Sequence, residues 1–252
     1  MRAWLGLTLA LARSTLREPV GFFFAIVFAP TLVLVLGTMF GNEPSVRTGG
    51  VGYLSATLPA FASVVLAIAG VMLLPVSQLQ LRETEALLRL RVTPLRPRVF
   101  LAAQITVHFV IGMVGILLAF AAGALAFGVE LPRSLALVLV ACALGLLAFL
   151  ALGCTLAALY PSSGTATGVG NVLMILLMLT SGAFVPVEVM PTGVQRFVEL
   201  SPVRQFVGLV RGLWHGDPWS EHLVPTAVLC AMVVVFGVVG ARLFRWQQHG
   251  SR

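Results

Sequence analysis

The only dense group of charged residues in this sequence lies at residues 81–98, where arginines and glutamates alternate with leucines. Its two glutamates come before most of its arginines, an order that complements the dipole of a helix, and Pro94 predicts where such a helix ends. Burying its seven charges at the centre of a bilayer would cost on the order of 20 kcal/mol, so the segment is expected outside the hydrocarbon. Its leucines would leave an apolar helix face uncovered. This pattern favours a docking element for a cytoplasmic partner over a linker that rests on lipid.

Other residues with chemical potential are sparse. Histidines and acids at residues 215–222 are metal-ligand types, but their spacing matches no metal-binding motif. His108 is alone within an apolar run, which favours a hydrogen-bonded packing residue over a proton relay. All 16 basic residues are arginine, so the chain has no lysine for a phosphate-binding loop. We therefore expect no catalytic site and no metal site, and any ATP hydrolysis must come from a partner.

The composition is that of a membrane protein. Of 252 residues, 59% are hydrophobic and only 10% are charged, against about 25% charged in soluble domains, and the mean hydropathy is +1.02. This excludes a water-soluble globular domain. The net charge of +7 does not indicate nucleic-acid binding, because the arginines lie at the ends of long apolar runs rather than on a polar domain.

Six helices that cross a bilayer are predicted, since each needs about 20 mostly apolar residues. The uncharged stretch at residues 134–187 is too long for one crossing, and a turn at residues 160–164 divides it. The predicted fold is an all-α integral membrane protein, a single transmembrane domain that covers residues 1–252. The six transmembrane helices are expected within residues 19–42, 48–81, 99–129, 134–159, 165–187 and 222–241.

The distribution of arginines predicts the orientation, because short cytoplasmic loops collect basic residues. With six crossings, both ends of the chain lie on one side. That side receives three arginines before the first span, five in residues 81–98 and three after the sixth span, against five on the opposite side. Both termini and residues 81–98 are therefore predicted to be cytoplasmic.

Two further segments are amphipathic but are not spans. Residues 2–17 carry leucines, a tryptophan and three arginines, which favours an interfacial helix along the cytoplasmic surface over a frayed terminus. Residues 188–214 predict two short helices, the second beginning at Ser201-Pro202, where a capping residue precedes a proline. Each has an apolar stripe but is too short to span, which predicts an external re-entrant helical hairpin. A simple surface hairpin is the alternative.

One face of the fifth span is small, polar or soft. Gly164 and Gly168 permit a close approach of helices, and Asn171 needs a hydrogen-bond partner away from lipid. This face either packs within one subunit or lies at a subunit interface or substrate path. Its members follow steps of three and four residues: Gly164, Gly168, Asn171, Met174, Met178 and Ser181.

Three groups of motifs give the sequence its resemblance to a known family. They are Arg82-Glu83 with Thr93-Pro94-Leu95, Ser181-Gly182-Ala183-Phe184-Val185-Pro186 with Pro191, and Ser201-Pro202 followed by Arg211-Gly212. With these motifs the chain resembles, over nearly its whole length, the permeases of the ATP-binding-cassette type-2 exporters, in particular the branch that exports drugs and natural products. It departs from that family at Ser201-Pro202, where Asn-Pro is common, and at Pro59-Ala60, where Pro-Gly is frequent.

The resemblance implies a half-transporter. Two permease subunits, identical or paralogous, would pair in membrane lipid, and each would receive a separate ABC ATPase that holds ATP and Mg²⁺. The chain itself would bind no cofactor and no nucleic acid. Cargo would pass along an interface formed largely by the second and fifth spans. The residues implied in ATPase coupling are Arg82, Glu83, Glu85, Arg89 and Arg91, and those implied in the substrate path or subunit interface are Phe61, Gly168, Asn171, Met174, Met178 and Ser181.

The predicted function is that of the permease subunit of an ATP-driven exporter in the bacterial cytoplasmic membrane. An apolar lining with hydroxyl groups predicts amphipathic or lipophilic cargo, such as a drug in multidrug efflux or a natural product. Within the family, the alternative is a permease for polysaccharides or lipid-linked glycans. Outside it, an integral-membrane enzyme that modifies lipids would need converging acids or histidines, which are sparse. An ATP-independent channel or scaffold is the other alternative.

Overall fold

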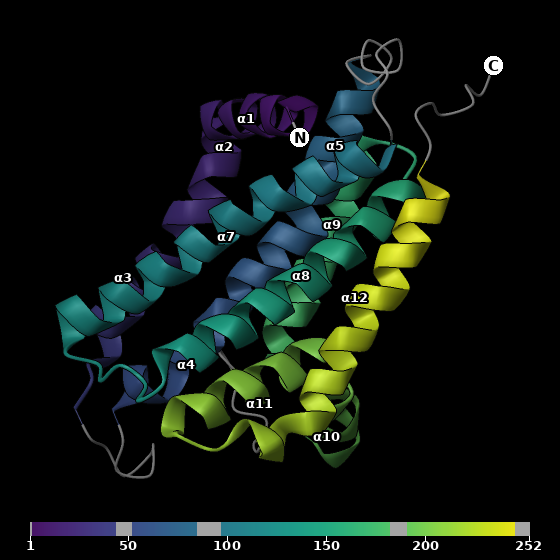
Figure 1. Ribbon diagram of the computed structural model, residues 1–252. Coiled ribbons are helices and arrows are strands. Elements are labelled where there is room, and N and C mark those ends of the chain that lie inside the picture. The colour runs from purple at the N-terminus through teal and green to yellow at the C-terminus, as the bar shows by residue number, and fades with distance from the viewer. Residues whose placement is uncertain (1, 44–51, 85–96, 182–190, 245–252) are drawn as a thin grey trace.

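The computed structural model describes residues 2–43, 52–84, 97–181 and 191–244, and the chain in these ranges is helical, as predicted (Figure 1). Two π-helical segments, Phe23–Val27 and Ile68–Leu73, join α2 to α3 and α4 to α5, and a 3-10 turn, Trp219–His222, precedes α12. The α-helices are α1 (Arg2–Arg17), α2 (Pro19–Phe22), α3 (Phe28–Phe40), α4 (Tyr53–Ala67), α5 (Leu74–Glu83), α7 (Pro97–Phe127), α8 (Leu135–Leu159), α9 (Ser163–Thr180), α10 (Thr192–Glu199), α11 (Pro202–His215) and α12 (Leu223–Leu243).

Five helices in the described ranges are long and apolar enough to cross a membrane. They correspond to the second to sixth predicted spans: Tyr53–Glu83, Pro97–Phe127, Leu135–Leu159, Ser163–Thr180 and Trp219–Leu243. The first predicted span, at residues 19–42, is a run of three helical pieces, of which α3 is apolar but only 13 residues long. A count of six spans therefore stays a prediction.

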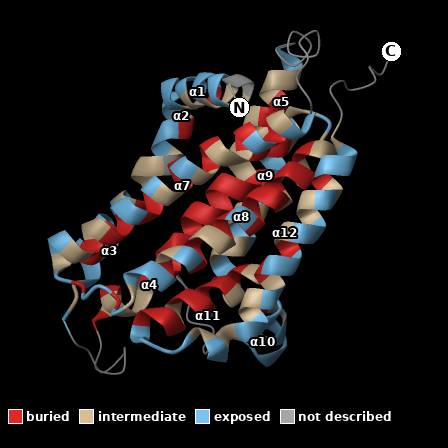
Figure 2. Ribbon diagram, viewed as in Figure 1, coloured by how far each residue is buried: buried red, intermediate tan, exposed pale blue. Residues whose placement is uncertain are grey.

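Helix α8 lies at the centre of the bundle, where Figure 2 shows the largest concentration of buried residues. It packs against α12, α7, α11 and the α4–α5 helix. The α8 sequence has no charged residue, and an apolar helix satisfies its backbone hydrogen bonds internally. At Gly70 and Gly153 the second and fourth spans meet backbone to backbone, and a β-carbon on Gly70 would lie 2.5 Å from the Phe149 carbonyl oxygen. Only glycine permits this approach.

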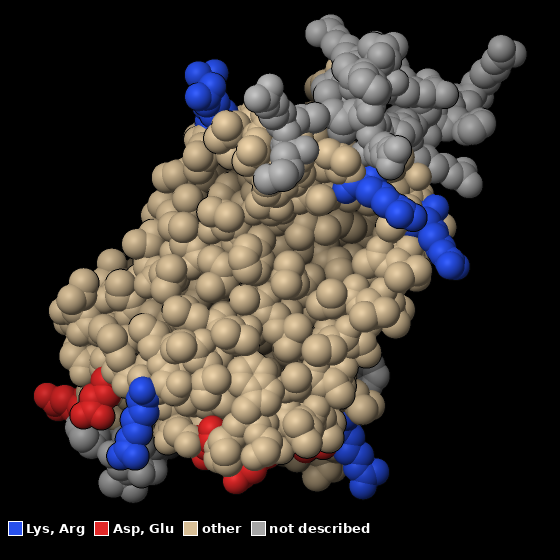
Figure 3. Space-filling model, in the orientation of Figure 1, with Lys and Arg blue, Asp and Glu red and all other residues tan. Residues whose placement is uncertain are grey.

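The bundle has two chemically distinct ends. We call the end with α1 and the last turn of α12 the terminal end, and the end with α10 and α11 the hairpin end (Figure 1). On the face that Figure 3 shows, the described charged side chains gather at these two ends and none lies on the flank between them. This distribution is what a membrane-spanning bundle requires, because charge is costly inside the bilayer.

Several element boundaries follow the sequence signals. The helix predicted at residues 2–17 is α1, and the turn predicted at residues 160–164 separates α8 from α9. Ser201 is the N-cap of α11, with Pro202 in its first turn, as predicted. The two short helices of the predicted hairpin are α10 and α11, while their insertion into a membrane stays a prediction.

Candidate coupling site and subunit face

The first candidate site is at the terminal end, where α5 leads into the charged segment at residues 81–98. Helix α5 runs on to Glu83, so Arg82 and Glu83 belong to the end of the second span. The sequence predicted that the first half of residues 81–98 is helical and that the helix ends at Pro94, and the part of this segment after Thr84 and before Pro97 lies outside the described residues. The coupling candidates Glu85, Arg89 and Arg91 lie outside the described residues.

Arg82, on α5, contacts the ends of two other helices, α8 and α12. Its Nη1 donates a hydrogen bond of 3.0 Å to the carbonyl oxygen of Ala157, in the last turn of α8. The last carbonyls of a helix have no partner within it, so this is a C-terminal cap supplied by a neighbouring helix. The Arg82 guanidinium carbon also lies 5.5 Å from the centre of the Phe244 ring, just after α12, at a cation–π distance.

Phe244 extends this contact to a fourth helix. Its ring centre is 5.6 Å from that of Phe100, which is fully buried near the start of α7. Aromatic pairs at this separation stabilise beyond the area that they bury. The ends of α5, α8 and α12 and the start of α7 are thus joined around one guanidinium.

Glu83 binds the start of α9. Its carboxylate accepts hydrogen bonds from the Ser163 backbone N–H, at 2.7 Å, and from the Ser163 Oγ, at 2.5 Å. The first N–H groups of a helix lack internal partners and attract negative charge. Ser162 supplies the usual cap as well, because its Oγ accepts from the Thr165 N–H at 3.1 Å. Burial raises the pKa of the nearby Tyr160 hydroxyl, so that side chain stays neutral.

The two described coupling candidates therefore contact other helices of the chain. Arg82 and Glu83 fasten the base of the 85–96 segment to the ends of α8, α9 and α12. The sequence analysis missed Ser163 and Phe244, although Pro161-Ser162-Ser163 has the residue types of a helix start.

The second candidate site is the face of α9 that was predicted from the stripe of small and polar residues between Gly164 and Ser181. Seventeen residues separate Gly164 from Ser181, so the predicted stripe drifts by about 100° around a helix of 3.6 residues per turn. Gly164 and Gly168 are exposed, and a β-carbon on Gly168 would meet nothing within 4 Å. Asn171 is half-buried, and its side chain makes no hydrogen bond within the described part of the chain.

The other end of the stripe turns inward. Met174 and Met178 pack against the main hydrophobic core, and Ser181 is buried, with its Oγ bonded to the Met178 carbonyl. Phe61 on α4 is also fully buried among the helices of its own subunit. The predicted residues therefore lie on two surfaces: Gly168 and Asn171 toward the outside, the remaining four toward the core. Their role in a path or interface stays a prediction.

An apolar groove lies beside the last turns of α9, toward the hairpin end and on a different side of the helix from Gly164 and Gly168. Its volume is about 360 Å³, and it lies between the last turns of α9 and the junction of α10 with α11. Thr180 and Ser201 meet across it through their hydroxyl groups at 3.2 Å. Leu176 and Leu200 expose apolar surface there. Sequence periodicity on α9 alone does not reveal this groove, because half of its lining residues come from residues 200–202.

The other titratable residues considered from the sequence, His108 and the group at residues 215–222, contact side chains or carbonyls of the same chain. His108 is buried and hydrogen-bonded, as predicted, with Nδ1 3.0 Å from the Gln104 carbonyl and Nε2 3.4 Å from the Ser77 Oγ. Near the hairpin end, His222 Nε2 lies 3.5 Å from the Asp217 carboxylate. No group of three His, Cys, Asp or Glu side chains within the described ranges is arranged to hold a metal ion.

These features define a class: a multi-pass helical membrane protein in which two charged residues, Arg82 and Glu83, bind neighbouring helices at the terminal end. Comparison with known proteins gives the family. The model of the ABC-2 type transporter family matches residues 4–214, and the chain belongs to this family. Because the family consists of membrane components of transporters, the chain is a transporter subunit and not an enzyme, as predicted.

Two bacterial proteins are similar to parts of the chain. Over 164 residues it is 33% identical to the "Putative transport permease YvfS" of Bacillus subtilis (strain 168), an alignment that covers 63% of this chain and 64% of that protein. Over 99 residues it is 29% identical to "Nodulation protein J" of Rhizobium leguminosarum bv. viciae, covering 39% of this chain and 38% of the relative. The chain thus aligns with less than two thirds of either relative's length.

Proposed function

We propose that the chain is the permease subunit of an ATP-driven exporter, which pairs with a second permease subunit and takes its energy from a separate ABC ATPase. Family membership supports the ATPase partner, as does the absence of lysine from the sequence. ATP and Mg²⁺ would be held by the partner. The contacts of Arg82 and Glu83 at the base of the 85–96 segment carry this proposal, because they give an applied force a route into the bundle.

The mechanism follows from where these contacts lead. Closure of the ATPases would move the 85–96 segment and, through Glu83, the start of α9. Coupling requires that the two states differ in contact energy, and hydrogen bonds to an exposed carboxylate can be made in one state and broken in the other. Movement of α9 would then change the gap between the two permease subunits.

The exposure of α9 supports its place at the subunit interface. Only 11% of the most apolar 18-residue stretch of α9 is buried inside the chain, whereas the corresponding share for the second span is 78%. Its outward face carries Gly164 and Gly168, which permit close helix approach, and the half-buried Asn171, whose amide favours a partner over lipid. The second span contributes little outward surface, so α9 would supply most of this chain's side of the interface.

The proposed cargo is amphipathic or lipophilic, a drug or natural product. The groove at the hairpin end of α9 supports this, because leucine side chains and two hydroxyl groups line it. A polysaccharide or lipid-linked glycan is the second candidate cargo, which family membership leaves open.

The proposed location is the bacterial cytoplasmic membrane, with the terminal end in the cytoplasm. Arg17, Arg98 and Arg242 lie at the terminal end, where the positive-inside rule expects them. Acidic residues such as Glu130 and Glu221 lie at the opposite end. Cysteine labelling from outside intact cells tests the orientation: a reagent that cannot cross membranes should reach a cysteine at Glu221 but not one at Arg17.

Disulfide cross-linking tests the interface. Val172 is exposed on the outward face of α9, and Val234 is equally exposed on α12 and serves as the matched control. In a variant without the native cysteines, Val172→Cys is expected to give a covalent permease dimer in membranes, while Val234→Cys remains monomeric. Cross-linking of Val234→Cys alone would place the interface on α12 and overturn this part of the proposal.

A further inference from the structure

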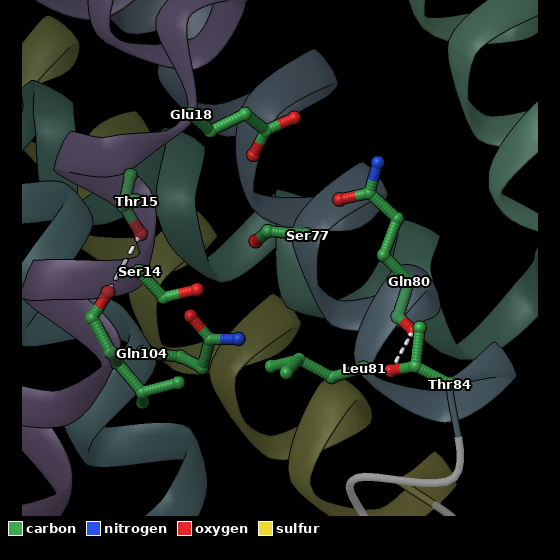
Figure 4. Close-up of a pocket in the computed structure, with 9 residues that line it drawn as sticks. Ser14, Thr15, Glu18, Ser77, Gln80, Leu81, Thr84 and Gln104 are labelled. Carbon is green, nitrogen blue, oxygen red and sulfur yellow. Dashed lines mark hydrogen bonds between the residues drawn. The ribbon is translucent and has the colours of Figure 1, made fainter.

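A second polar site lies at the terminal end, apart from the coupling contacts and from α9. It is a pocket of about 340 Å³ between α1, the last turns of α5 and the first turns of α7 (Figure 4). Its volume is at the lower end of the range for small-molecule sites. Two leucines, Leu11 and Leu81, form an apolar wall, and the remaining lining is polar.

Gln104 gives the pocket a buried hydrogen-bond donor without a partner. The residue is 1% exposed, and its Nε2 has no hydrogen-bond acceptor within the described part of the chain. Figure 4 shows its amide directed into the space between Ser14 and Leu81. A buried amide that lacks its hydrogen bond is costly, so an oxygen atom of an occupant would relieve this cost.

The rest of the pocket offers acceptors. The hydroxyl hydrogens of Thr15 and Thr84 are donated to carbonyls of their own helices, at 3.0 and 2.8 Å, which leaves oxygen lone pairs for an occupant. Glu18 adds a carboxylate at the rim and has no basic partner among the described residues. The matching occupant is a cation with several N–H donors, joined to an oxygen acceptor that reaches Gln104.

The positions of these groups match the order of the headgroup atoms in a lipid that lies in the bilayer with its headgroup at the membrane surface. Glu18 is exposed at the rim of the pocket, whereas Gln104 is 1% exposed and lies seven residues into α7, about 10 Å along the helix axis from Pro97. An ammonium at the surface and an ester or phosphate oxygen below it have this order in an aminophospholipid. Its chains would continue along Leu11 and Leu81.

We propose that this pocket binds the headgroup of an ethanolamine phospholipid, with the primary ammonium at Glu18 and a phosphate or ester oxygen at the Gln104 amide. A choline headgroup has no N–H to donate to the hydroxyl oxygens, and an anionic headgroup is repelled by Glu18. The bound lipid would join α1 to α5, the helix whose end carries Arg82 and Glu83.

Lipid retention by the purified full-length chain, measured by native mass spectrometry, tests this site. With equal amounts of phosphatidylethanolamine and phosphatidylcholine of the same chains, the expected preference for ethanolamine is about tenfold, since hydrogen bonds to charged groups are among the stronger ones. Glu18→Gln is expected to remove most of this preference, whereas Gln104→Leu is expected to lower the retention of both lipids, because both carry the phosphate and ester oxygens. Glu130→Gln, an exposed carboxylate at the hairpin end, is the matched control and should keep the preference.

Two further arms make the test decisive. Ser14→Trp fills the pocket from the exposed face of α1 without removing a charge, and it is expected to lower ethanolamine retention while the chain stays helical and monodisperse. Free phosphoethanolamine should not displace the lipid, and displacement at a similar concentration would assign the site to a soluble amine and overturn the proposal. Equal retention of the two lipids, or full retention by Glu18→Gln, would also overturn it.

Discussion

Replacement of Glu83 by alanine is the sharpest test of the contacts at the base of the charged segment. The change removes both acceptors of the two Ser163 donors, at 2.7 and 2.5 Å, and the negative charge at the start of α9. A capping interaction contributes about 1 kcal/mol, and a charge at a helix terminus adds about 0.3–1 kcal/mol. Because Glu83 is exposed, solvent screens its charge and makes the charge contribution small. The expected loss of unfolding free energy is therefore close to the capping contribution, about 1 kcal/mol.

Ser163→Pro supplies the matched background for a double-mutant cycle. Ser163 is the first residue of α9 after its Ser162 cap, where proline is tolerated, and proline removes both donors to Glu83 at once. Ser162 already has the extended backbone that a following proline requires, with φ −150° and ψ 162°. In this background Glu83→Ala should lose only the solvent-screened interaction of its charge with the start of α9, so the coupling free energy of the two hydrogen bonds should be about 1 kcal/mol.

The assay is equilibrium unfolding of the purified chain in detergent, with cargo transport and ATPase copurification measured on the same variants. Glu83→Ala should lower transport but retain the ATPase, because its carboxylate faces Ser163. Charge reversal at Arg89 should instead reduce copurification. If Glu83→Ala costs the same free energy with serine or proline at residue 163, the two residues are not coupled and the reasoning is refuted.

Three further predictions concern packing and the subunit face. Arg82→Leu should lower the unfolding free energy by about 1–2 kcal/mol, and Arg82→Lys by less, in the same unfolding assay. Gly153→Ala should cost about 1–3 kcal/mol because its β-carbon would collide with the Gly70 carbonyl, while Gly237→Ala, with open space around it, should be neutral or slightly stabilising. An equal effect of the two alanine substitutions would contradict this packing. Asn171→Leu should weaken subunit pairing by about 1 kcal/mol in a dimer titration, and unchanged pairing would argue against Asn171 at the interface.

The sequence predicted the elements better than their contacts. The helix at residues 2–17, the turn at residues 160–164 and the start of α11 at Ser201-Pro202 were predictable, because amphipathic periodicity and capping residues act locally. The first span stays a prediction, since α3 is apolar but only 13 residues long.

The candidate site was predicted in residue type but not in arrangement. The charge pattern singled out Arg82 and Glu83, yet their partners, Ala157 and Ser163, are 75 and 80 residues away along the chain. The stripe on α9 followed helical spacing, but its drift around the helix turns Ser181 into the core and leaves Gly168 outside. Spacing along one helix does not say which neighbouring helix covers a given face.

By itself, the sequence determined that this is a helical membrane protein without a nucleotide-binding lysine. Hydropathy and residue types can be read from the chain without knowing which residues are in contact. The tertiary structure alone decided that Arg82 and Glu83 are bound to other helices, and that Gln104 and Glu18 share one pocket. These contacts depend on which helix ends meet at the terminal end of the bundle. That choice is made by packing between distant segments, in which small residues such as Gly70 and Gly153 set how closely the spans approach.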